Sequence, residues 1–377
     1  MKKNLLFAAL AASVMVSCSN DDIVDVNHGE GIAFRASMDR ALTRANATTL
    51  QNMTEFNVTA IGNNANYFTD MTVTKIGDEW KPAHTYYWPG YELSFFAYTP
   101  KISGVSISND RSEIKAFSPE RKAAEQKDLL VSFNKGDKKN ENNGIAMNFK
   151  HALSQIEVLA KCSNDKIKIE VLGVKMENAA AKADFTFPKE VTTTDYTLPQ
   201  EQWSNLQEKD DHSKAYMIKG EKNMVLTDKA QSIMFGDNNF MLIPQKQTKW
   251  DGSADTKGTY LSVLCRIYSL DGDKETLLYP RPTQDDNKNG KYAFAAVGID
   301  IDWKPGMKYT YTLNFCGDGG GAGEIDPNPG PVDPTDPNPG PVDPNPGPGG
   351  EEILGKPIKF TVTVDEWKDE SKDVDMK

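Results

Sequence analysis

The sequence is poor in the residues that build catalytic and metal sites. Only 4 histidines and 4 cysteines occur among its 377 residues, and none of them has the spacing of a zinc-binding or catalytic motif. It has no glycine-rich phosphate-binding loop and no Gly-x-Ser-x-Gly turn. These absences predict a protein that is not an enzyme and that needs no cofactor or metal ion.

Cysteine pairs are equally scarce. Cys162, Cys265 and Cys316 lie far apart and are odd in number, which favours neither a disulfide framework nor a Cys-x-x-Cys metal site. We expect them to be mostly buried apolar residues. One disulfide among them stays open, because sequence spacing does not choose a pair.

Positive charge is in short supply. The chain has 43 Lys and Arg against 54 Asp and Glu, for a formal net charge of −11 at pH 7. This surplus of acid disfavours a nucleic-acid partner. After the N-terminal residues the sequence has no long apolar run, so no membrane span is expected there.

The one apolar run lies at the N-terminus. Lys2 and Lys3 precede apolar residues 5–16, a stretch that is too short for a permanent membrane helix and typical of an export signal. It ends at Val16-Ser17-Cys18, which resembles the lipobox of bacterial lipoproteins and predicts lipidation of Cys18 after removal of residues 1–17. An ordinary secretory signal with an incidental cysteine is the alternative. The acidic residues 18–30 are expected to form a tether.

Helical periodicity is rare, and short strand-like runs take its place. Runs rich in Val, Ile, Phe, Tyr and Thr recur between Gly, Asn, Asp and Pro. This pattern predicts an all-β fold made of β-sandwiches rather than alternating strands and helices. A polar run over 134–144 contains almost no apolar residue, so we expect one domain over 31–143 and a second over 144–316.

Residues 317–355 predict a Pro/Gly-rich linker. The motif Asp-Pro-Asn-Pro-Gly-Pro begins there at Asp326, Asp336 and Asp343. Such a segment cannot form a core and favours an extended chain, which from Asp326 to Gly350 would reach on the order of 75 Å at ~3.1 Å per residue.

A last amphipathic strand is expected within residues 356–377. Ile358, Phe360, Val362 and Val364 alternate with polar residues and share one face. A lone strand is unstable, so it must pair with a sheet edge of its own domain or of a neighbouring molecule.

Several segments resemble the fimbrillin family of Bacteroidales type V pili, the Mfa-like group of surface lipoproteins. They are the lipobox followed by Ser19-Asn20-Asp21-Asp22, the early run 32–37, Tyr86-Tyr87-Trp88-Pro89 with Phe95-Phe96-Ala97-Tyr98, and the run 148–156. The resemblance spans nearly the whole chain. It implies two tandem Greek-key β-sandwiches of transthyretin-like topology in a stalk, tip or accessory subunit of a pilus at the outer membrane surface.

The resemblance also implies assembly by donor-strand exchange with other pilus subunits. An arginine-specific protease would remove an early strand over 31–38, and a strand of another subunit would enter the groove left by Ile32, Phe34 and Ala36. The candidate donor residues are Ile358, Phe360, Val362 and Val364.

Two arginines are candidate cleavage sites. Arg40 and Arg44 follow the early strand, and cleavage after Arg44 would make Ala45 the new N-terminus. The lipid on Cys18, which holds the precursor at the membrane, would then be lost. In the alternative interpretation both arginines are plain loop residues and the protein stays anchored.

The competing function is a lipid-anchored module that binds glycans or another host or bacterial surface ligand. Its candidate contact residues are Trp80, Tyr86, Tyr87, Trp88, Trp250 and Trp303. Aromatic residues also dominate sandwich cores, so burial separates the two hypotheses. An exposed aromatic row favours ligand binding, whereas an apolar groove under residues 31–38 favours polymerisation.

Overall fold

The computed structural model describes residues 31–38, 48–139, 144–207, 215–236, 238–253, 257–281, 291–317, 319–330, 342–343 and 345–367. Almost all regular structure within these ranges is β-strand. The exceptions are two 3-10 turns, η1 (Ala123–Glu125) and η2 (Gln200–Gln202). The all-β fold class is therefore confirmed. None of the helical turns in these ranges is long and apolar enough to cross a membrane.

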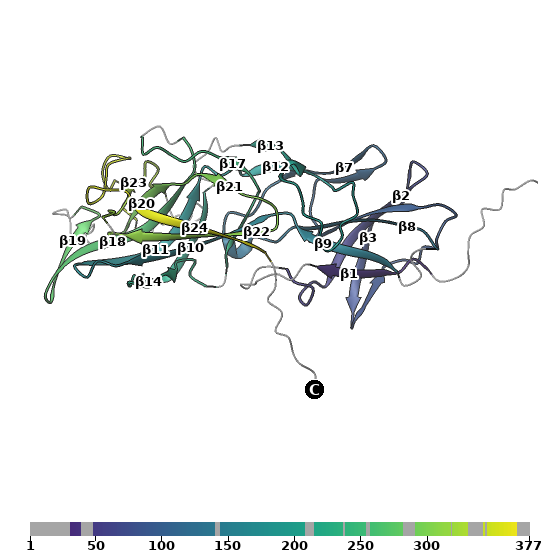
Figure 1. Cartoon of the computed structure of the whole chain (residues 1–377), viewed down its shortest axis with the longest axis horizontal. Coiled ribbons are helices and arrows are strands. Elements are labelled where there is room, and N and C mark those ends of the chain that lie inside the picture. The colour runs from purple at the N-terminus through teal and green to yellow at the C-terminus, as the bar shows by residue number, and fades with distance from the viewer. Residues whose placement is uncertain are drawn as a thin grey trace, which may run out of the picture.

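The molecule is elongated, and a seven-stranded barrel occupies the half with the earlier strands (Figure 1). Its order is β1-β4-β3-β2-β5-β8-β9. The strands are β1 (Phe34–Met38), β2 (Glu55–Gly62), β3 (Ala65–Ile76), β4 (Glu79–Pro82), β5 (Leu93–Thr99), β8 (Leu130–Gly136) and β9 (Ile145–His151). Alternate side chains such as Phe56, Phe95 and Phe149 fill its interior. The expected sandwich is thus closed into a barrel, because β1 joins β4 to β9.

The division between the two halves falls later than the sequence predicted. β9 pairs with β8 and with β1, so it belongs to the barrel. The polar run over 134–144 includes the end of β8 and the connection from β8 to β9. A polar run that contains glycine can form either a hairpin connection or a domain linker, and composition does not distinguish the two. The pairing of β9 with β8 and β1 places the boundary between the two halves at about Ala152.

The second half is a sandwich of two sheets. One has the order β15-β10-β22-β24, with β16 also on β10, and the other has the order β14-β11-β18-β20-β23, with β19 on β18. The strands are β10 (Ser154–Cys162), β11 (Ile167–Glu177), β14 (Tyr216–Val225), β15 (Gln231–Ser232), β16 (Phe240–Leu242), β18 (Tyr260–Asp271), β19 (Lys274–Tyr279), β20 (Ala293–Gly298), β22 (Met307–Phe315), β23 (Glu324–Ile325) and β24 (Lys359–Glu366). Val158, Val171, Val263 and Tyr311 contribute to the core between the sheets.

A third sheet joins the two halves of the chain. Its order is β13-β12-β7-β6, from β6 (Val105–Ser108), β7 (Arg111–Phe117), β12 (Lys182–Thr186) and β13 (Trp203–Gln207). Ile114 of β7 is paired with Phe185 of β12, and both are fully buried. A small further sheet pairs β17 (Lys246–Gln247) with β21 (Ile301–Asp302). Barrel and sandwich are therefore linked through a shared core.

The proline-rich segment does not form the extended spacer that its composition predicts. The backbone N–H of Gly350 donates to the Ile325 carbonyl at 2.8 Å, so the two ends of the segment meet. Asp326 is buried and accepts hydrogen bonds from Lys175 Nζ at 2.8 Å and Ser262 Oγ at 2.6 Å. Val342 packs in an apolar cluster on the same sheet. A buried carboxylate needs charged partners, and these partners fix the segment on the sandwich.

Candidate functional site

The first strand is held mainly by one neighbour. β1 runs parallel to β9 along its whole length, from the pair Phe34 and Ile145 to the pair Met38 and Phe149. On its other side it meets β4 only at Phe34 and Trp80. A groove of about 550 Å³ opens beside β1 and is lined by residues of β1, β3 and β4. β1 therefore closes the barrel along a partly open seam.

The inner face of β1 is part of the barrel core. Ile32 and Phe34 are 3% and 5% exposed, and Ala36 is half-buried. The Phe34 ring lies edge-on to Phe56 and Phe95, with ring centroids 5.9 and 6.0 Å apart. Full burial of one such side chain stabilises by about 1.5–3 kcal/mol. The structure thus places Ile32, Phe34 and Ala36 together on the inner side of the barrel wall.

The last strand lies at the edge of the sandwich. β24 pairs antiparallel with β22, with Phe360 opposite Leu313 and Val362 opposite Tyr311. Ile358 is 3% exposed and Phe360 is half-buried, but Val362 and Val364 are 41% and 48% exposed. The candidate donor residues therefore share one face, as predicted. Only the beginning of that face is covered.

Trp367 fixes the other end of β24 at the junction of barrel and sandwich. Its ring stacks on the His151 ring, with centroids 4.0 Å apart and an interplanar angle of 12°. Its backbone N–H donates to the Gly306 carbonyl at 2.8 Å. Trp367 was not among the aromatic candidates from the sequence.

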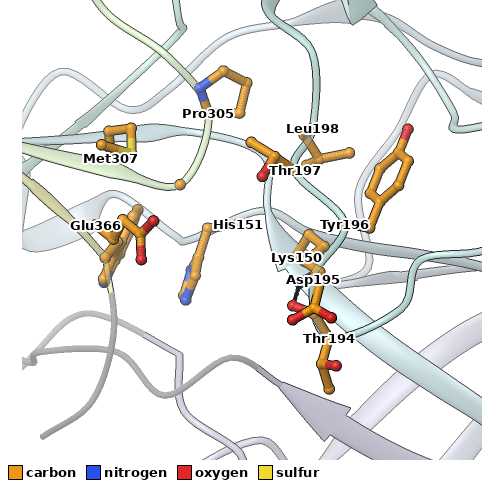
Figure 2. A pocket seen from close by; sticks show the side chains of 12 residues that line it. Lys150, His151, Thr194, Asp195, Tyr196, Thr197, Leu198, Pro305, Met307 and Glu366 are labelled. Atoms are coloured by element: carbon orange, nitrogen blue, oxygen red, sulfur yellow. Dashed lines mark hydrogen bonds between the residues drawn. The ribbon is translucent and has the colours of Figure 1, made fainter.

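The partners of His151 connect this junction to the segment after β1. His151 Nδ1 lies 2.8 Å from Asp128 Oδ2, and both side chains are buried. The same carboxylate oxygen accepts the backbone N–H of Thr48 at 3.1 Å. A cavity of about 260 Å³ adjoins His151 and is bordered by Glu366 and Tyr196 among others (Figure 2).

The aromatic candidates for ligand binding lie mostly in cores. Trp80, Trp88, Trp250 and Trp303 are buried, and Tyr86 and Tyr87 are half-buried. Trp303 donates its indole N–H to the Tyr311 hydroxyl, and Trp250 donates its own to the Ser253 carbonyl. These six residues do not form an exposed aromatic row.

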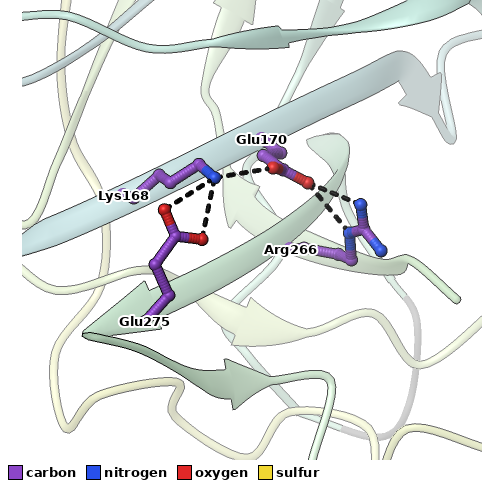
Figure 3. A network of polar contacts seen from close by, with 4 residues as sticks. All are labelled: Lys168, Glu170, Arg266 and Glu275. Atoms are coloured by element: carbon purple, nitrogen blue, oxygen red, sulfur yellow. Dashed lines mark hydrogen bonds and ion pairs between the residues drawn. The ribbon is translucent and has the colours of Figure 1, made fainter. Parts of the chain in front are cut away.

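Charged clusters outside the junction are satisfied ion pairs. On the outer face of the sandwich, Lys168 Nζ lies 2.9 Å from Glu275 and 3.1 Å from Glu170, and Arg266 lies 2.6 Å from Glu170 (Figure 3). Burial raises the pKa of Glu170, but the hydrogen bonds from Lys168 and Arg266 outweigh it and leave the pKa lowered. The cluster holds β11, β18 and β19 together and offers no activated base.

The three cysteines of the described residues lie in or against the core of the sandwich. Cys162 and Cys265 are buried, Cys316 is half-buried, and all three are free. Burial raises the pKa of the Cys265 thiol, whereas a hydrogen bond with Cys316 lowers that of Cys162 to about 7. Within the described ranges, no group of three His, Cys, Asp or Glu side chains could hold a metal ion.

Fold and site together define an all-β protein. Its first strand closes a barrel, and its last strand lies at the edge of a sheet in the sandwich. Residues 43–326 match the family model described as fimbrillin-like, which covers more than half of the chain. The protein therefore belongs to the fimbrillin-like family. This family consists of fimbrial structural and adhesion proteins, so the chain has a pilus-subunit or adhesion role at the cell surface.

Solved structures of proteins from Bacteroides species are similar to the chain at low identity. A fimbrial protein from Bacteroides vulgatus is 12% identical, with 90% of this chain and 100% of that chain covered and a TM-score of 0.49. A cell adhesion protein from Bacteroides ovatus is 12% identical, with coverage of 91% and 99% and a TM-score of 0.44. One from Bacteroides eggerthii is 14% identical, with coverage of 90% and 97% and a TM-score of 0.44. No curated protein matches the chain.

Proposed function

We propose that this protein is a structural pilus subunit that assembles by donor-strand exchange. In this proposal β1 is removed by proteolysis and the last strand of another copy takes its place on β9. The observation that carries the proposal is that residues 32–38 and 358–364, which contain most of β1 and β24, share one apolar pattern: Ile32, Phe34, Ala36 and Met38 match Ile358, Phe360, Val362 and Val364 in order.

This match gives a register for the incoming strand. The first two positions are identical, so Phe360 would lie where Phe34 now contacts Phe56 and Phe95. Val362 and Val364 would follow at the half-buried positions of Ala36 and Met38. The alternation of apolar and polar residues is maintained, which keeps every apolar side chain on the groove face.

The burial of β24 on its own subunit supports transfer. Val362 and Val364 leave more than two fifths of their surface exposed on the sandwich edge. In the groove these two valines would take the half-buried positions of Ala36 and Met38, so transfer would bury part of the apolar surface that is now exposed. The donor thus has apolar surface to gain by leaving its own sheet for a groove.

Export and processing complete the proposal. Cys18, Arg40, Arg44 and Ala45 lie outside the described residues, and the proposal for them rests on the sequence. The lipidated precursor would stay at the outer membrane through Cys18 until cleavage after Arg44 removes the anchor together with β1. Polymerisation would then depend on processing, which prevents assembly before export.

The test is treatment of the purified precursor with an arginine-specific protease. We expect a mass that corresponds to an N-terminus at Ala45, followed by filaments in electron micrographs. A precursor with Arg40→Lys and Arg44→Lys is the matched control and should remain uncut and monomeric. Cleavage near these arginines that yields only monomers, or no cleavage there at all, would count against the proposal.

A further inference from the structure

Two cysteines lie at the ends of neighbouring strands in the sandwich. β10 and β22 are parallel, and Cys162, the last residue of β10, is opposite Phe315, the last residue of β22. Cys316 is the next residue of the chain. The thiols of Cys162 and Cys316 are joined by a hydrogen bond. Cys265 lies on β18, in the other sheet of the sandwich. The fold thus selects one pair among the three cysteines.

The backbone at Cys316 keeps its side chain beside Cys162. Successive side chains of a strand point to opposite faces, so a regular continuation of β22 would separate Phe315 from Cys316. Cys316 instead has a φ of 53°, in the left-handed region that few residues other than glycine adopt. Its N–H donates to the Gly321 carbonyl at 2.8 Å. Phe315 and Cys316 therefore both pack against the core that contains Cys162.

The spacing of the two strands suits a covalent bond between these thiols. Neighbouring strands lie about 4.8 Å apart and rise about 3.3 Å per residue. A residue one step beyond its direct partner is then roughly 6 Å away between Cα atoms, and disulfides span Cα separations of about 4.4–6.8 Å. Cys162 and Cys316 stand in this relation along β10 and β22. The cross-link can therefore form without moving either strand out of its sheet.

The two thiols differ in access and in acidity. Cys162 is 6% exposed, whereas Cys316 is half-buried. The hydrogen bond from the Cys316 thiol lowers the pKa of Cys162 to about 7, and the same bond together with burial raises the pKa of Cys316. The thiolate is the nucleophile in disulfide exchange. Cys316 is thus the sulfur that a molecule in solution reaches, and Cys162 is the sulfur that can attack next.

We propose that Cys162 and Cys316 are a disulfide site, which is closed by exchange with an oxidant that itself carries a disulfide. Cys316 first forms a mixed disulfide with the oxidant and releases one oxidant thiol. The Cys162 sulfur then attacks the Cys316 sulfur, and the second oxidant thiol leaves. Two protein thiols are oxidised to one disulfide, while the oxidant is reduced to two thiols that keep the two protons. The export predicted from residues 1–17 would bring the chain to a compartment where such bonds persist.

The bond would close a loop that contains most of the sandwich. Strands β11, β14, β18 and β20 lie between residues 162 and 316, whereas β24 follows them. A cross-link over a long loop stabilises mainly by restricting the unfolded chain. It would hold β22 on β10 and leave β24 untied. This last consequence matters only if the proposed function holds, but the disulfide site itself does not depend on it.

Thiol mapping on the uncut, full-length chain tests the site. The chain carries Cys18→Ser, so that three thiols remain, and it is treated with oxidised glutathione under native conditions. The remaining thiols are alkylated in denaturant, and unreduced peptides are analysed by mass spectrometry. We expect a loss of two hydrogen atoms, a peptide pair joined through Cys162 and Cys316, and one alkylated thiol at Cys265.

Urea unfolding supplies a second measurement. Oxidation should raise the unfolding midpoint by on the order of 1 M urea, and dithiothreitol should reverse the change. Cys265→Ala is the matched control and should keep both the cross-link and the shift. Cys316→Ser should abolish both. A cross-link that leaves the midpoint unchanged would overturn the stabilising effect.

Three results of the mapping would overturn the disulfide site itself. They are three alkylated thiols after oxidation, a glutathione adduct on Cys316 that does not close, and a bond through Cys265. None of them affects the donor-strand proposal, because the uncut precursor exchanges no strand. A failure of the protease to produce filaments would likewise leave the disulfide site standing.

Discussion

The first and last strands of this chain have nearly the same pattern and opposite surroundings. β1 lies between two neighbours in a closed barrel, and its Phe34 is 5% exposed. β24 has one neighbour at a sheet edge, and its Val364 is 48% exposed. An alternating pattern therefore indicates that a strand has an apolar face without indicating how much of that face is covered. In the proposed assembly, this difference in coverage would favour transfer of β24 into the groove that β1 leaves.

The largest expected effect comes from truncating the matching phenylalanines. Phe34→Ala should lower the free energy of unfolding by about 3–5 kcal/mol, because it leaves a cavity among packed rings. Phe360→Ala should cost only about 1 kcal/mol, since this side chain is half-buried at an edge. Urea unfolding of the two uncut variants measures both values. Equal losses would contradict the contrast between the strands.

A smaller effect is expected for the exposed valines. Val362→Thr combined with Val364→Thr should change the stability of the monomer by no more than about 0.5 kcal/mol, because both side chains are largely exposed there. The same double change should weaken binding of a 356–367 peptide to the protein cut by the arginine-specific protease by about tenfold, since the groove would bury the added hydroxyls.

Thr361→Ser with Thr363→Ser is the matched control, because these residues lie on the opposite face of the strand. It should affect neither stability nor peptide binding. If the control pair weakens binding as much as the valine pair, the proposed orientation of the donor strand is incorrect.

The smallest effect concerns the sheet β13-β12-β7-β6, which contains neither β1 nor β24. The Ala116 N–H, the Asn205 amide and the Lys115 ammonium bond to Asp184 and lower its pKa from 3.8 to about 2. Because the pKa of Asp184 is lower in the folded state, its ionised carboxylate stabilises the fold at pH values above 3.8. This contribution is lost as the pH falls from 3.8 towards about 2. Asp184→Asn should remove that pH dependence.

Unfolding by guanidinium at a series of acidic pH values measures this change. The variant should lose less stability than the wild-type chain over the same acidic range. Protection of β1 and β24 against hydrogen exchange should be the same in both proteins at neutral pH, because Asp184 contacts neither strand. A selective loss of protection in β1 or β24 would show that the sheet β13-β12-β7-β6 helps to position that strand.

The positions that sequence reasoning predicted well are those with strong local patterns. The all-β class follows from short runs with the two-residue alternation of a strand, which is a local property of the sequence. The shared face of the last strand follows from the same period. The role of Trp367 was missed, because a single aromatic after a strand has no periodic partner.

The sequence by itself determined that this chain is a β-protein with an amphipathic strand near each end, because side-chain alternation is local. Only the tertiary structure decided which edges those strands meet. It closed the barrel with β1, returned the proline-rich segment to the sandwich through Asp326 and Lys175, and stacked Trp367 on His151. These contacts join residues more than a hundred positions apart, and their stability depends on burial and charge pairing that no local pattern specifies.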